Sequence, residues 1–583
     1  MNSTEHAGVA AGLLPLLDGS APLIEYLTGL HPLLPPTILG VLCHALFLRA
    51  YEVEQFMYTL LCNSAFLTVS VFAAYLSQHW TVSGAVVQTA AITGSFWTGV
   101  FTSMAVYRAW FHPLRKFPGP WGAKISRFWS ARRAARKVQY YKEVESMHET
   151  HGDFIRTGPR ELCIVRSSAV PLILGPKSDC HKSTWYGQVD VTSQACSIHM
   201  TRDYALHRLR RRGWDRGFSV KALNSYIPRI LDKTDKFLAQ ITKPDGGAVD
   251  ATSWTMLLTF DIMGKVGFGK DFRGVETGVE HPAIRCIHDH MEVLGIMSHV
   301  PWLLNILPRI PGASRGYAPF FGWCASEVIA KKESMDTSAE PQDVVSHLIK
   351  SFLDKDAAAP PTEAALHDDS RAIIIAGSDT TATTLAWIFY FLCSNEHVLA
   401  RLHAEVDAVM PRGGRRASAS GEEDDWSYDK ARQITYIDDI INEALRIKPA
   451  LLTGGYRETP PGGLQVDEQF VPGGTNVFVP IRQIQNDPRY WPEPDRFVPE
   501  RWGERRAEMG TEGAPFIPFS MGRYSCPGKN LAMMTMRVVL SRFAQECTVR
   551  FAPGEDGVAF EAGAKDTFTT TLLPLMLEFR PRE

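Results

Sequence analysis

The chain has 583 residues, a net charge of -2 at neutral pH and 45% hydrophobic residues. This charge balance does not provide the basic surface that nucleic acids require, so we exclude nucleic acid as a partner. The ten cysteines are scattered, with no C-x-x-C pair and no His/Cys cluster. Their distribution excludes the common zinc modules and indicates a reducing environment for most of the chain.

The first hundred residues contain one Arg, no Lys and five acidic residues. Three apolar stretches lie there, at about 33–48, 56–76 and 84–107. The second and third are long enough to cross a bilayer, which takes roughly 20 helical residues, whereas the first is shorter and contains two prolines. We therefore expect residues 1–111 to form a membrane anchor with two or three transmembrane helices. The alternative is a buried helical hairpin.

A basic block follows the last apolar stretch directly, with nine Lys or Arg and no acid in residues 101–140. By the positive-inside rule, this block and everything after it face the cytosol. With three spans the amino terminus lies in the lumen, where the triplet Asn2-Ser3-Thr4 is open to glycosylation and would make the chain a glycoprotein. The proline-rich hinge HPLRKFPGPWG, which begins at His112, connects this anchor to a second domain, 112–583.

The second domain is predicted to be mainly helical with small β-sheets. Residues 154–167 contain two short extended runs around Gly158-Pro159, which indicates a hairpin, and β-like stretches return at 465–480 and 567–579. Two polar or Pro-rich segments, 357–363 and 411–428, are typical of surface loops. No internal repeat is apparent, so we expect one domain.

One predicted helix has an unusual composition. The apolar stretch 363–393 contains AGSDTT in its middle, which includes Asp379 and Thr380. Gly, Asp and consecutive Thr all disfavour a helix interior, and Thr hydroxyls can divert backbone hydrogen bonds. Two interpretations stay open: a kink whose hydroxyls are satisfied by the helix itself, or a pocket wall where a small ligand and a proton path need room and hydroxyl groups.

The stretch PFSMGRYSCPGKNLA, residues 518–532, places Cys526 between a glycine turn and the start of a predicted helix. Unpaired N–H groups and the helix dipole favour negative charge there, so a thiolate that can ligate a metal is easily held. Gly522 and Gly528 would let the backbone turn and approach a flat partner. A buried, inert cysteine is the alternative.

Several charged residues form weaker patterns. Glu443 and Arg446 are one helical turn apart and can pair on one face. His207 and Arg211 are four apart on a probable helix and can point at the same anion, although a basic run is more often a solvated face.

Taken together and in this order, these motifs resemble the cytochrome P450 family over about residues 112–580. The matching pieces are the hinge prolines, the His207/Arg211 pair, AGSDTT, ExxR as Glu443 and Arg446, PERW with Arg501, and the Cys526 loop. The resemblance implies a P450 fold with heme b whose iron is ligated by Cys526, the proximal thiolate that favours O–O cleavage.

The same resemblance implies roles for other residues. Asp379 and Thr380 match the acid–alcohol pair that delivers protons. Glu443, Arg446 and Arg501 match a buried network that braces the fold. The expected cofactor-binding residues are His207, Arg211, Arg457, Phe519 and Gly528, of which the three cations match heme-propionate positions.

The sequence departs from the family pattern at two places. Tyr524 stands where the heme loop usually has a propionate-binding Arg, with Arg523 one residue early, and Gln485 stands where many members have His. Both departures resemble the fungal microsomal branch, which often makes secondary metabolites.

The resemblance implies a membrane-bound monooxygenase that inserts one atom of O2 into a lipophilic small molecule. Pocket walls are expected at 183–202, 291–321, 451–456 and near Phe568, and their composition fits a lipophilic substrate. Because 57 residues follow Cys526, too few for a flavin domain, we expect a separate NADPH-cytochrome P450 reductase in the endoplasmic reticulum membrane. The alternatives are a heme-thiolate isomerase or dehydratase, and a membrane heme-binding sensor without turnover.

Overall fold

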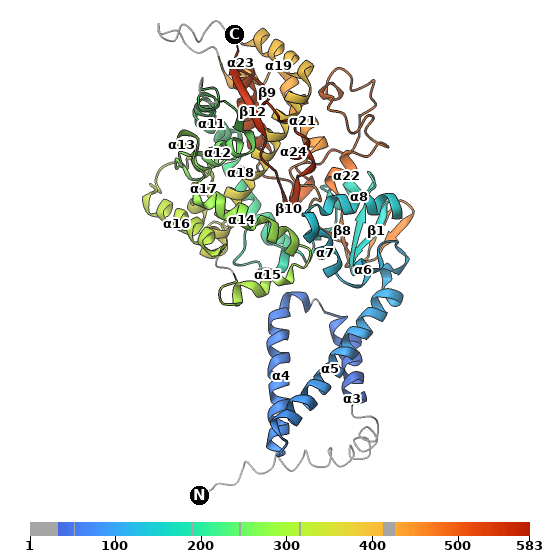
Figure 1. Ribbon diagram of the computed structural model, residues 1–583. Coiled ribbons are helices and arrows are strands. Elements are labelled where there is room, and N and C mark those ends of the chain that lie inside the picture. Colours follow the sequence, from blue (N-terminus) through green and yellow to red (C-terminus); the bar gives the residue numbers. More distant parts are fainter. Residues whose placement is uncertain are drawn as a thin grey trace. The chain divides into compact units, whose positions relative to one another are not determined.

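A computed structural model describes residues 33–51, 53–188, 190, 192–243, 247–313, 316–411 and 426–582. The chain divides into two compact units, Met1–Arg115 and Lys116–Glu583 (Figure 1). Asn2 and most of the predicted loop 411–428 lie outside the described residues.

The smaller unit contains three helical segments. They are α3 (Leu34–Leu42), which continues into the π-helix Cys43–Leu48, α4 (Met57–Ser77) after a short turn at Val53–Phe56, and α5 (Val82–Val106), which continues to Phe111. Helices α3 and α5 approach so closely that a Cβ added to Gly40 would lie 2.1 Å from the carbonyl oxygen of Phe96. Glycines at helix crossings permit this backbone contact. His44 Nδ1 and Ser103 Oγ, 2.8 Å apart, add a hydrogen bond between the same helices.

Two helices of the described residues are long and apolar enough to cross a membrane. One is Val53–Ser77, which has no buried residues in its most apolar window; the other, Glu363–Ser394, is mostly buried and is a core helix of the larger unit. The expected span at 84–107 forms α5, which carries Gln88 and many Ser and Thr, and it falls short of this apolarity. Helix α4 with its preceding turn thus has the length and apolarity of a membrane anchor, and the anchor and its number of spans stay predictions.

The larger unit is mostly helical, as the sequence predicts. Its helices are α6 (Trp121–Ile125), α7 (Phe128–Lys137), α8 (Tyr140–His151), α9 (Ala169–Leu174), α10 (Tyr204–Gly217), α11 (Val220–Ile241), α12 (Ala251–Met263), α13 (Gly274–Thr277), α14 (Pro282–Met297), α15 (Trp302–Ile306), α16 (Ala318–Ser334), α17 (Val344–Leu353), α18 (Glu363–Ser394), α19 (Glu396–Val409), α20 (Tyr428–Ala431), α21 (Thr435–Ile447), α22 (Ile481–Gln485), α23 (Lys529–Glu546) and α24 (Val558–Ala562).

Small sheets lie at the edges of this helical body. Their strands are β1 (Phe154–Gly158), β2 (Glu161–Ile164), β3 (His181–Lys182), β4 (Val249–Asp250), β5 (Arg457–Glu458), β6 (Leu464–Val466), β7 (Gln469–Val471), β8 (Asn476–Phe478), β9 (Cys547–Phe551), β10 (Lys565–Thr567), β11 (Thr569–Thr571) and β12 (Met576–Pro581). The sheet orders are β1-β2-β8-β5-β3, β4-β12-β9, β6-β7 and β10-β11. The predicted hairpin β1–β2 is confirmed, and β8 joins it in parallel through β2.

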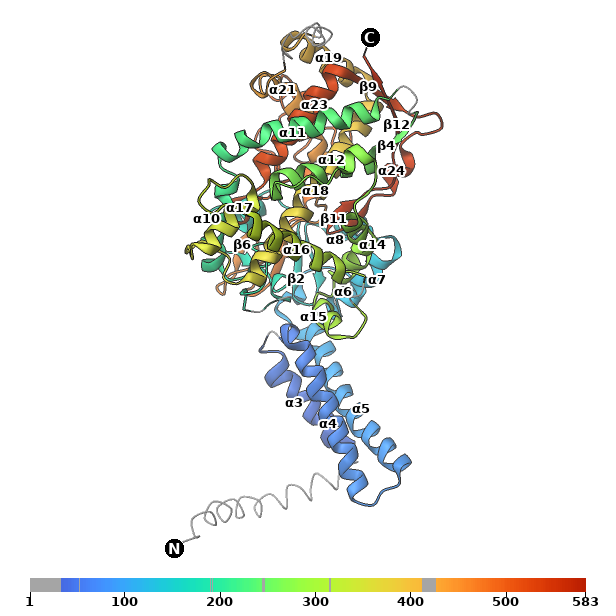
Figure 2. The same cartoon turned by 90° about the vertical axis from the view of Figure 1, so that its left-hand side faces the viewer.

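The core is organised around α18. Its run 385–393 is apolar on every side, a pattern typical of a fully buried helix, and Leu385, Trp387 and Phe389 are at most 1% exposed. Helices α12, α16 and α17 pack against it (Figure 2). Because α18 runs without interruption from Glu363 to Ser394, the sequence motif AGSDTT does not break it. The motif is therefore held at a fixed place inside the unit.

Candidate active site

The Cys526 loop has the geometry that the sequence predicts. A turn at Gly522–Tyr524 precedes the cysteine, and α23 begins at Lys529 with Gly528 as its N-cap. Gly522 has φ +66°, and a Cβ there would lie 2.5 Å from the carbonyl oxygen of Leu174, so only glycine fits. The amide of Cys526 donates to the carbonyl of Phe519 at 2.9 Å and closes the loop. Phe519 thus supports the cysteine through its backbone.

Gly528 does not have the role in turning the chain that we expected. Its φ is -84°, which any residue adopts, and a Cβ would meet only Phe218 and the Cys526 sulfur at 3.8 and 3.9 Å. The protein atoms alone therefore do not require glycine at this position. Close approach of a flat group on the cysteine side remains the reason that we propose for it.

Cys526 is exposed, and yet its thiol is surrounded by enough protein to be desolvated. Among the described cysteines of the larger unit it is the exposed one, while the others are buried or half-buried. Burial nevertheless raises the pKa of the Cys526 thiol, which outweighs the backbone N–H groups of Gly528 and Lys529 that lower it. In the protein without a bound metal, burial thus outweighs the favourable helix terminus, and the thiolate stays a prediction that depends on the metal. A bound metal cation would deprotonate such a thiol outright.

The predicted cations come from two elements near this loop. His207 and Arg211 lie on α10, and Arg457 lies on β5. Burial lowers the pKa of His207 to about 2, so the ring is neutral. The Arg211 guanidinium donates to Asp215 Oδ1 and to the carbonyl of Ser525, both at 2.7 Å. Arg211 therefore braces the cysteine loop, and its sharing of one anion with His207 stays a prediction.

Tyr524 lies beside two cations and the neutral His207. Its ring is 4.8 Å from the His207 ring, 4.8 Å from Arg457 Cζ and 5.3 Å from the Nζ of Lys182. Aromatic faces attract cations at such distances. Arg523 is directed elsewhere and covers the ring of Tyr204 at 4.6 Å. The tyrosine is therefore a neutral surface that organises the cations around it.

Lys182 is a residue that the sequence reasoning missed. It is 4% exposed, pairs with Arg457 across β3 and β5, and donates from Nζ to the carbonyls of Ile198 and His199 at 2.8 and 2.7 Å. Burial, and then the charge of Arg457, hold the pKa of Lys182 well below its usual range. A single lysine in an aromatic segment gives no sequence signal of this arrangement.

These cations leave positive charge uncompensated. Within the described residues, Lys182 and Arg457 form no ion pair with a carboxylate, and Arg457 Nε has no hydrogen-bond partner although the residue is 3% exposed. Buried charges need partners, so the cluster fits a dianionic group. The two propionates of heme are such a group. Together with the accessible sulfur of Cys526, the residues present therefore fit heme.

The proton-delivery candidates lie on α18. The Thr380 hydroxyl donates to the carbonyl of Ala376 at 2.7 Å, whereas Asp379 accepts a hydrogen bond from Thr569 on β11. Packing requires glycine at position 377, because a Cβ there would lie 2.4 Å from the sulfur of Met263 on α12. The Thr380 hydroxyl is thus satisfied within an uninterrupted helix, while Asp379 bonds to another element, and the pocket wall with its proton path stays a prediction.

The predicted bracing network is fully formed. Glu443 accepts from Arg446 at 2.8 and 2.9 Å and from Arg501 Nε at 2.9 Å, and all three side chains are 0% exposed. The indole of Trp502 donates to the same carboxylate at 3.0 Å. Gln485 connects this network to the cysteine loop, because its amide accepts from the backbone of Ile517 and donates to the end of α21. Gln485 therefore has a definite structural role.

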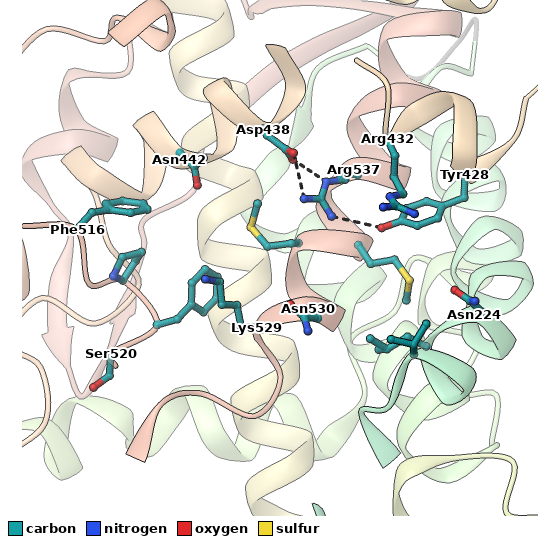
Figure 3. Close-up of a pocket in the computed structure, with 16 residues that line it drawn as sticks. Asn224, Tyr428, Arg432, Asp438, Asn442, Phe516, Ser520, Lys529, Asn530 and Arg537 are labelled. Atoms are coloured by element: carbon teal, nitrogen blue, oxygen red, sulfur yellow. Dashed lines mark hydrogen bonds and ion pairs between the residues drawn. The ribbon is translucent and has the colours of Figure 1, made fainter. Parts of the chain in front are cut away.

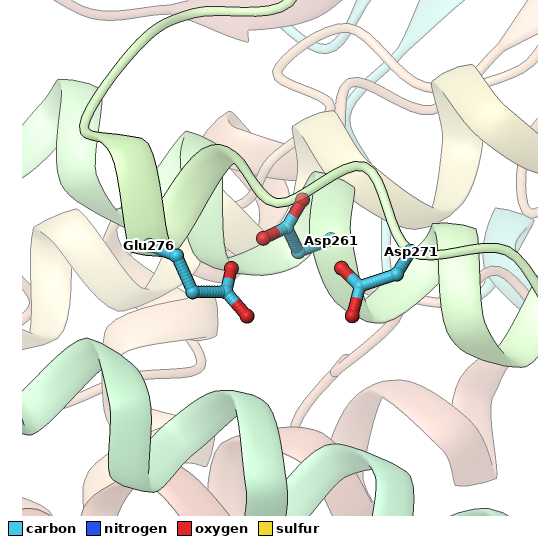
Figure 4. A group of neighbouring side chains, drawn as sticks. All are labelled: Asp261, Asp271 and Glu276. Atoms are coloured by element: carbon cyan, nitrogen blue, oxygen red, sulfur yellow. The ribbon is translucent and has the colours of Figure 1, made fainter.

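An acidic group elsewhere resembles a metal site. The carboxylates of Asp261, Asp271 and Glu276 face a common point (Figure 4). Lys233, which is 0% exposed, supplies an ammonium to them at distances of 3.5, 2.6 and 2.8 Å. The lysine provides the positive charge, so this group is an ion-pair cluster that joins α11 to the region after α12.

Comparison with known proteins agrees with this geometry. Residues 118–579 match the Cytochrome P450 family. The chain is 33% identical to cytochrome P450 monooxygenase FCK2 of Fusarium pseudograminearum over 94% of this chain and 97% of that protein. It is 30% identical to tryprostatin B 6-hydroxylase of Aspergillus fumigatus, over 93% and 95% of the two chains. Monooxygenase lcsK of Purpureocillium lilacinum is 31% identical, over 84% and 87%. The chain therefore belongs to the cytochrome P450 family, whose members bind heme through a cysteine thiolate.

Proposed function

We propose that this monooxygenase acts on a lipophilic, aromatic small molecule of fungal secondary metabolism, and that Cys526 is its heme ligand. The observation that carries the substrate class is an aromatic wall formed by segments that are predicted to line the pocket. Trp185 and Phe568 have parallel rings with centroids 5.5 Å apart and an interplanar angle of 4°, and the ring of His199 meets Phe568 edge-on at 5.5 Å. Tyr456 continues this wall beside Trp185. Such surfaces suit planar apolar ligands.

The relatives support the same substrate class. One of them is named for hydroxylation of tryprostatin B, and it aligns with nearly the full length of this chain. The wall residues lie in the segments 183–202 and 451–456 and near Phe568, where the sequence resemblance predicts pocket walls. We therefore take tryprostatin B as the first probe substrate.

Heme bound through Cys526 would supply oxygen activation, and the protein supplies its binding and the protons. Arg457, Lys182 and His207 would hold the propionates, since they lack other anionic partners. Thr380 donates its own hydroxyl proton to Ala376, which leaves its oxygen lone pairs free to accept a hydrogen bond from water. Asp379, the residue before Thr380, would exchange protons at its carboxylate oxygens. An isomerase or dehydratase would not need this pair.

Electrons would enter near the start of α23. A hollow of about 470 Å³ is lined there by Phe519 and Ser520 of the cysteine loop and by Lys529 and Asn530 (Figure 3). Arg537 across the hollow is held by Asp438 at 2.6 and 3.0 Å. We propose that NADPH-cytochrome P450 reductase docks on this face. The reductase and this enzyme would share the endoplasmic reticulum membrane. The larger unit would lie in the cytosol, and the residues that precede it in the chain would form a multi-pass anchor.

The test is product profiling in microsomes that contain the reductase. With tryprostatin B, NADPH and labelled O2, we expect substrate-dependent NADPH consumption and one labelled oxygen atom in each product molecule. Product without NADPH or O2 would favour the isomerase or dehydratase. Absence of turnover with a broad panel of aromatic lipophilic substrates would favour the sensor.

A further inference from the structure

The carboxyl-terminal hairpin β10–β11 reaches the middle of α18. There the hydroxyl of Thr569 donates a hydrogen bond to Asp379 Oδ2, and the two residues are 3% and 9% exposed. They are 190 positions apart in the chain. The hairpin therefore supplies the hydrogen-bond donor for Asp379, the acid in the middle of α18.

The position of Thr569 is fixed by bonds on both sides. Thr567 and Thr569 are paired residues of the hairpin, and the Thr567 hydroxyl donates to the Thr569 carbonyl at 2.7 Å. The neighbouring Thr570 donates its amide to the carbonyl of Ala450 at 2.9 Å and accepts from the Thr383 hydroxyl at 3.1 Å. The Thr569 hydroxyl is thus held against α18 by the backbone and does not depend on its own rotamer alone.

The residue before Thr569 belongs to the aromatic wall. Phe568 has φ +88°, a conformation that a phenylalanine rarely adopts, and its ring contacts Trp185 and His199. Such a backbone persists where surrounding contacts fix it, and it changes readily when those contacts change. A molecule that displaces the Phe568 ring would therefore act on a strained backbone position directly beside Thr569, and a small change of φ there would alter the direction of the Thr569 hydroxyl.

We propose that Thr569 is a positioning residue that holds the carboxylate of Asp379 for proton delivery, and that Phe568 couples this hydrogen bond to the presence of substrate at the aromatic wall. This inference rests on the proposed role of Asp379 as a proton donor. It adds a residue from a distant hairpin to that role.

The charges around Asp379 give the direction of the effect. Burial raises the pKa of Asp379, whereas the Thr569 hydroxyl and the charge of His288 on α14 lower it. His288 is itself paired with Glu280, 3.1 Å from its Nδ1, and Asp289 is a further charge near it. An O–H donor stabilises the ionised carboxylate. Loss of the Thr569 hydroxyl must therefore raise the pKa of Asp379.

The experiment compares Thr569→Val, which removes the hydroxyl at nearly constant volume, with Thr569→Ser, which retains it. Thr571→Val is the matched control, because its hydroxyl bonds to Thr567 on the same hairpin. In heme-loaded enzyme, infrared difference spectra give the titration of the Asp379 carboxyl, identified by its absence in Asp379→Asn. NADPH consumption with the reductase gives a second pH profile.

We expect Thr569→Val to move both profiles to higher pH, Thr569→Ser to restore them, and Thr571→Val to leave them in place. Unmoved profiles in Thr569→Val, or an equal shift in Thr571→Val, would overturn the inference. The proposed function fails separately, if Asp379→Asn leaves the rate and pH profile of NADPH consumption unchanged.

For the coupling, the probe is tryprostatin B: its addition should shift the infrared titration in the wild type and leave that of Thr569→Val unmoved. An equal shift in both proteins would contradict the coupling.

Discussion

Arg457→Met is expected to change the heme-free and the heme-loaded protein in opposite directions. Arg457 is 3% exposed, lies in register with Lys182, and forms no ion pair with a carboxylate among the described residues. In the heme-free protein it is a buried charge that also lowers the pKa of the neighbouring Lys182, and both effects are unfavourable. In the heme-loaded protein it would be a partner of a propionate.

The magnitudes follow from these contacts. A hydrogen bond to a charged group contributes about 1.5–3 kcal/mol, so its loss should speed heme release by about 10- to 100-fold. Removal of an unpaired buried polar group should raise the free energy of unfolding of the heme-free protein by about 1–3 kcal/mol. The lost bond from Arg457 Nη1 to the Tyr456 carbonyl, 3.0 Å long, reduces this gain.

The assays are heme transfer to an apo-globin acceptor and urea unfolding of the heme-free protein. Arg202→Met is the matched control, because Arg202 is paired with Glu458 at 2.5 Å and touches the cluster around Tyr524 only through a hydrogen bond from its Nε to the backbone carbonyl of Lys182, 3.2 Å long, among the contacts of the described residues. That variant should destabilise the heme-free protein and leave heme release nearly unchanged. If Arg457→Met instead destabilises the heme-free protein and heme release stays at the wild-type rate, the surplus of positive charge is not a binding site for an anion.

Three further outcomes follow from the same site. Cys526→Ala should abolish the red-shifted Soret band of the reduced carbon monoxide complex, and an unchanged band would exclude this ligand. Tyr524→Phe keeps the ring that contacts Arg457 and should change heme transfer little, whereas faster loss than in Arg457→Met would show that the hydroxyl is the main anchor. Glu443→Gln leaves Arg446 and Arg501 buried without a full counter-charge and should cost about 3–5 kcal/mol in urea unfolding; a loss as small as that of an exposed pair would contradict the network.

Local patterns in the sequence predicted the parts of the site that depend on neighbouring residues. The turn at Gly522 and the start of α23 follow from glycine and helix-forming residues close to Cys526. Glu443 and Arg446 are one turn apart on a helix, so their pairing could be expected. Where a role depends on one element alone, spacing and propensity are sufficient.

Long-range contacts are the part that the sequence could not provide. Lys182 becomes a member of the cation cluster only because β3 lies beside β5, which is more than 270 residues away. The glycine at 377 is required by packing, because the space that a Cβ would take is filled by Met263 of α12. The bond between Asp379 and Thr569 also depends on where the last hairpin packs. No local periodicity records such contacts, because they arise from the packing of separate elements.

The tyrosine at position 524 can be understood from the charges around it. Lys182 and Arg457 are buried, and neither forms an ion pair with a carboxylate among the described residues. Both lie over the Tyr524 ring. An arginine in this place would put a third positive charge beside them in the heme-free protein, at a considerable electrostatic cost. The neutral ring instead attracts both cations through its face and keeps them oriented. We propose that Lys182 takes the place of the charge that the loop arginine supplies in the family pattern, so that the departure at 524 and the buried lysine on β3 are two parts of one arrangement.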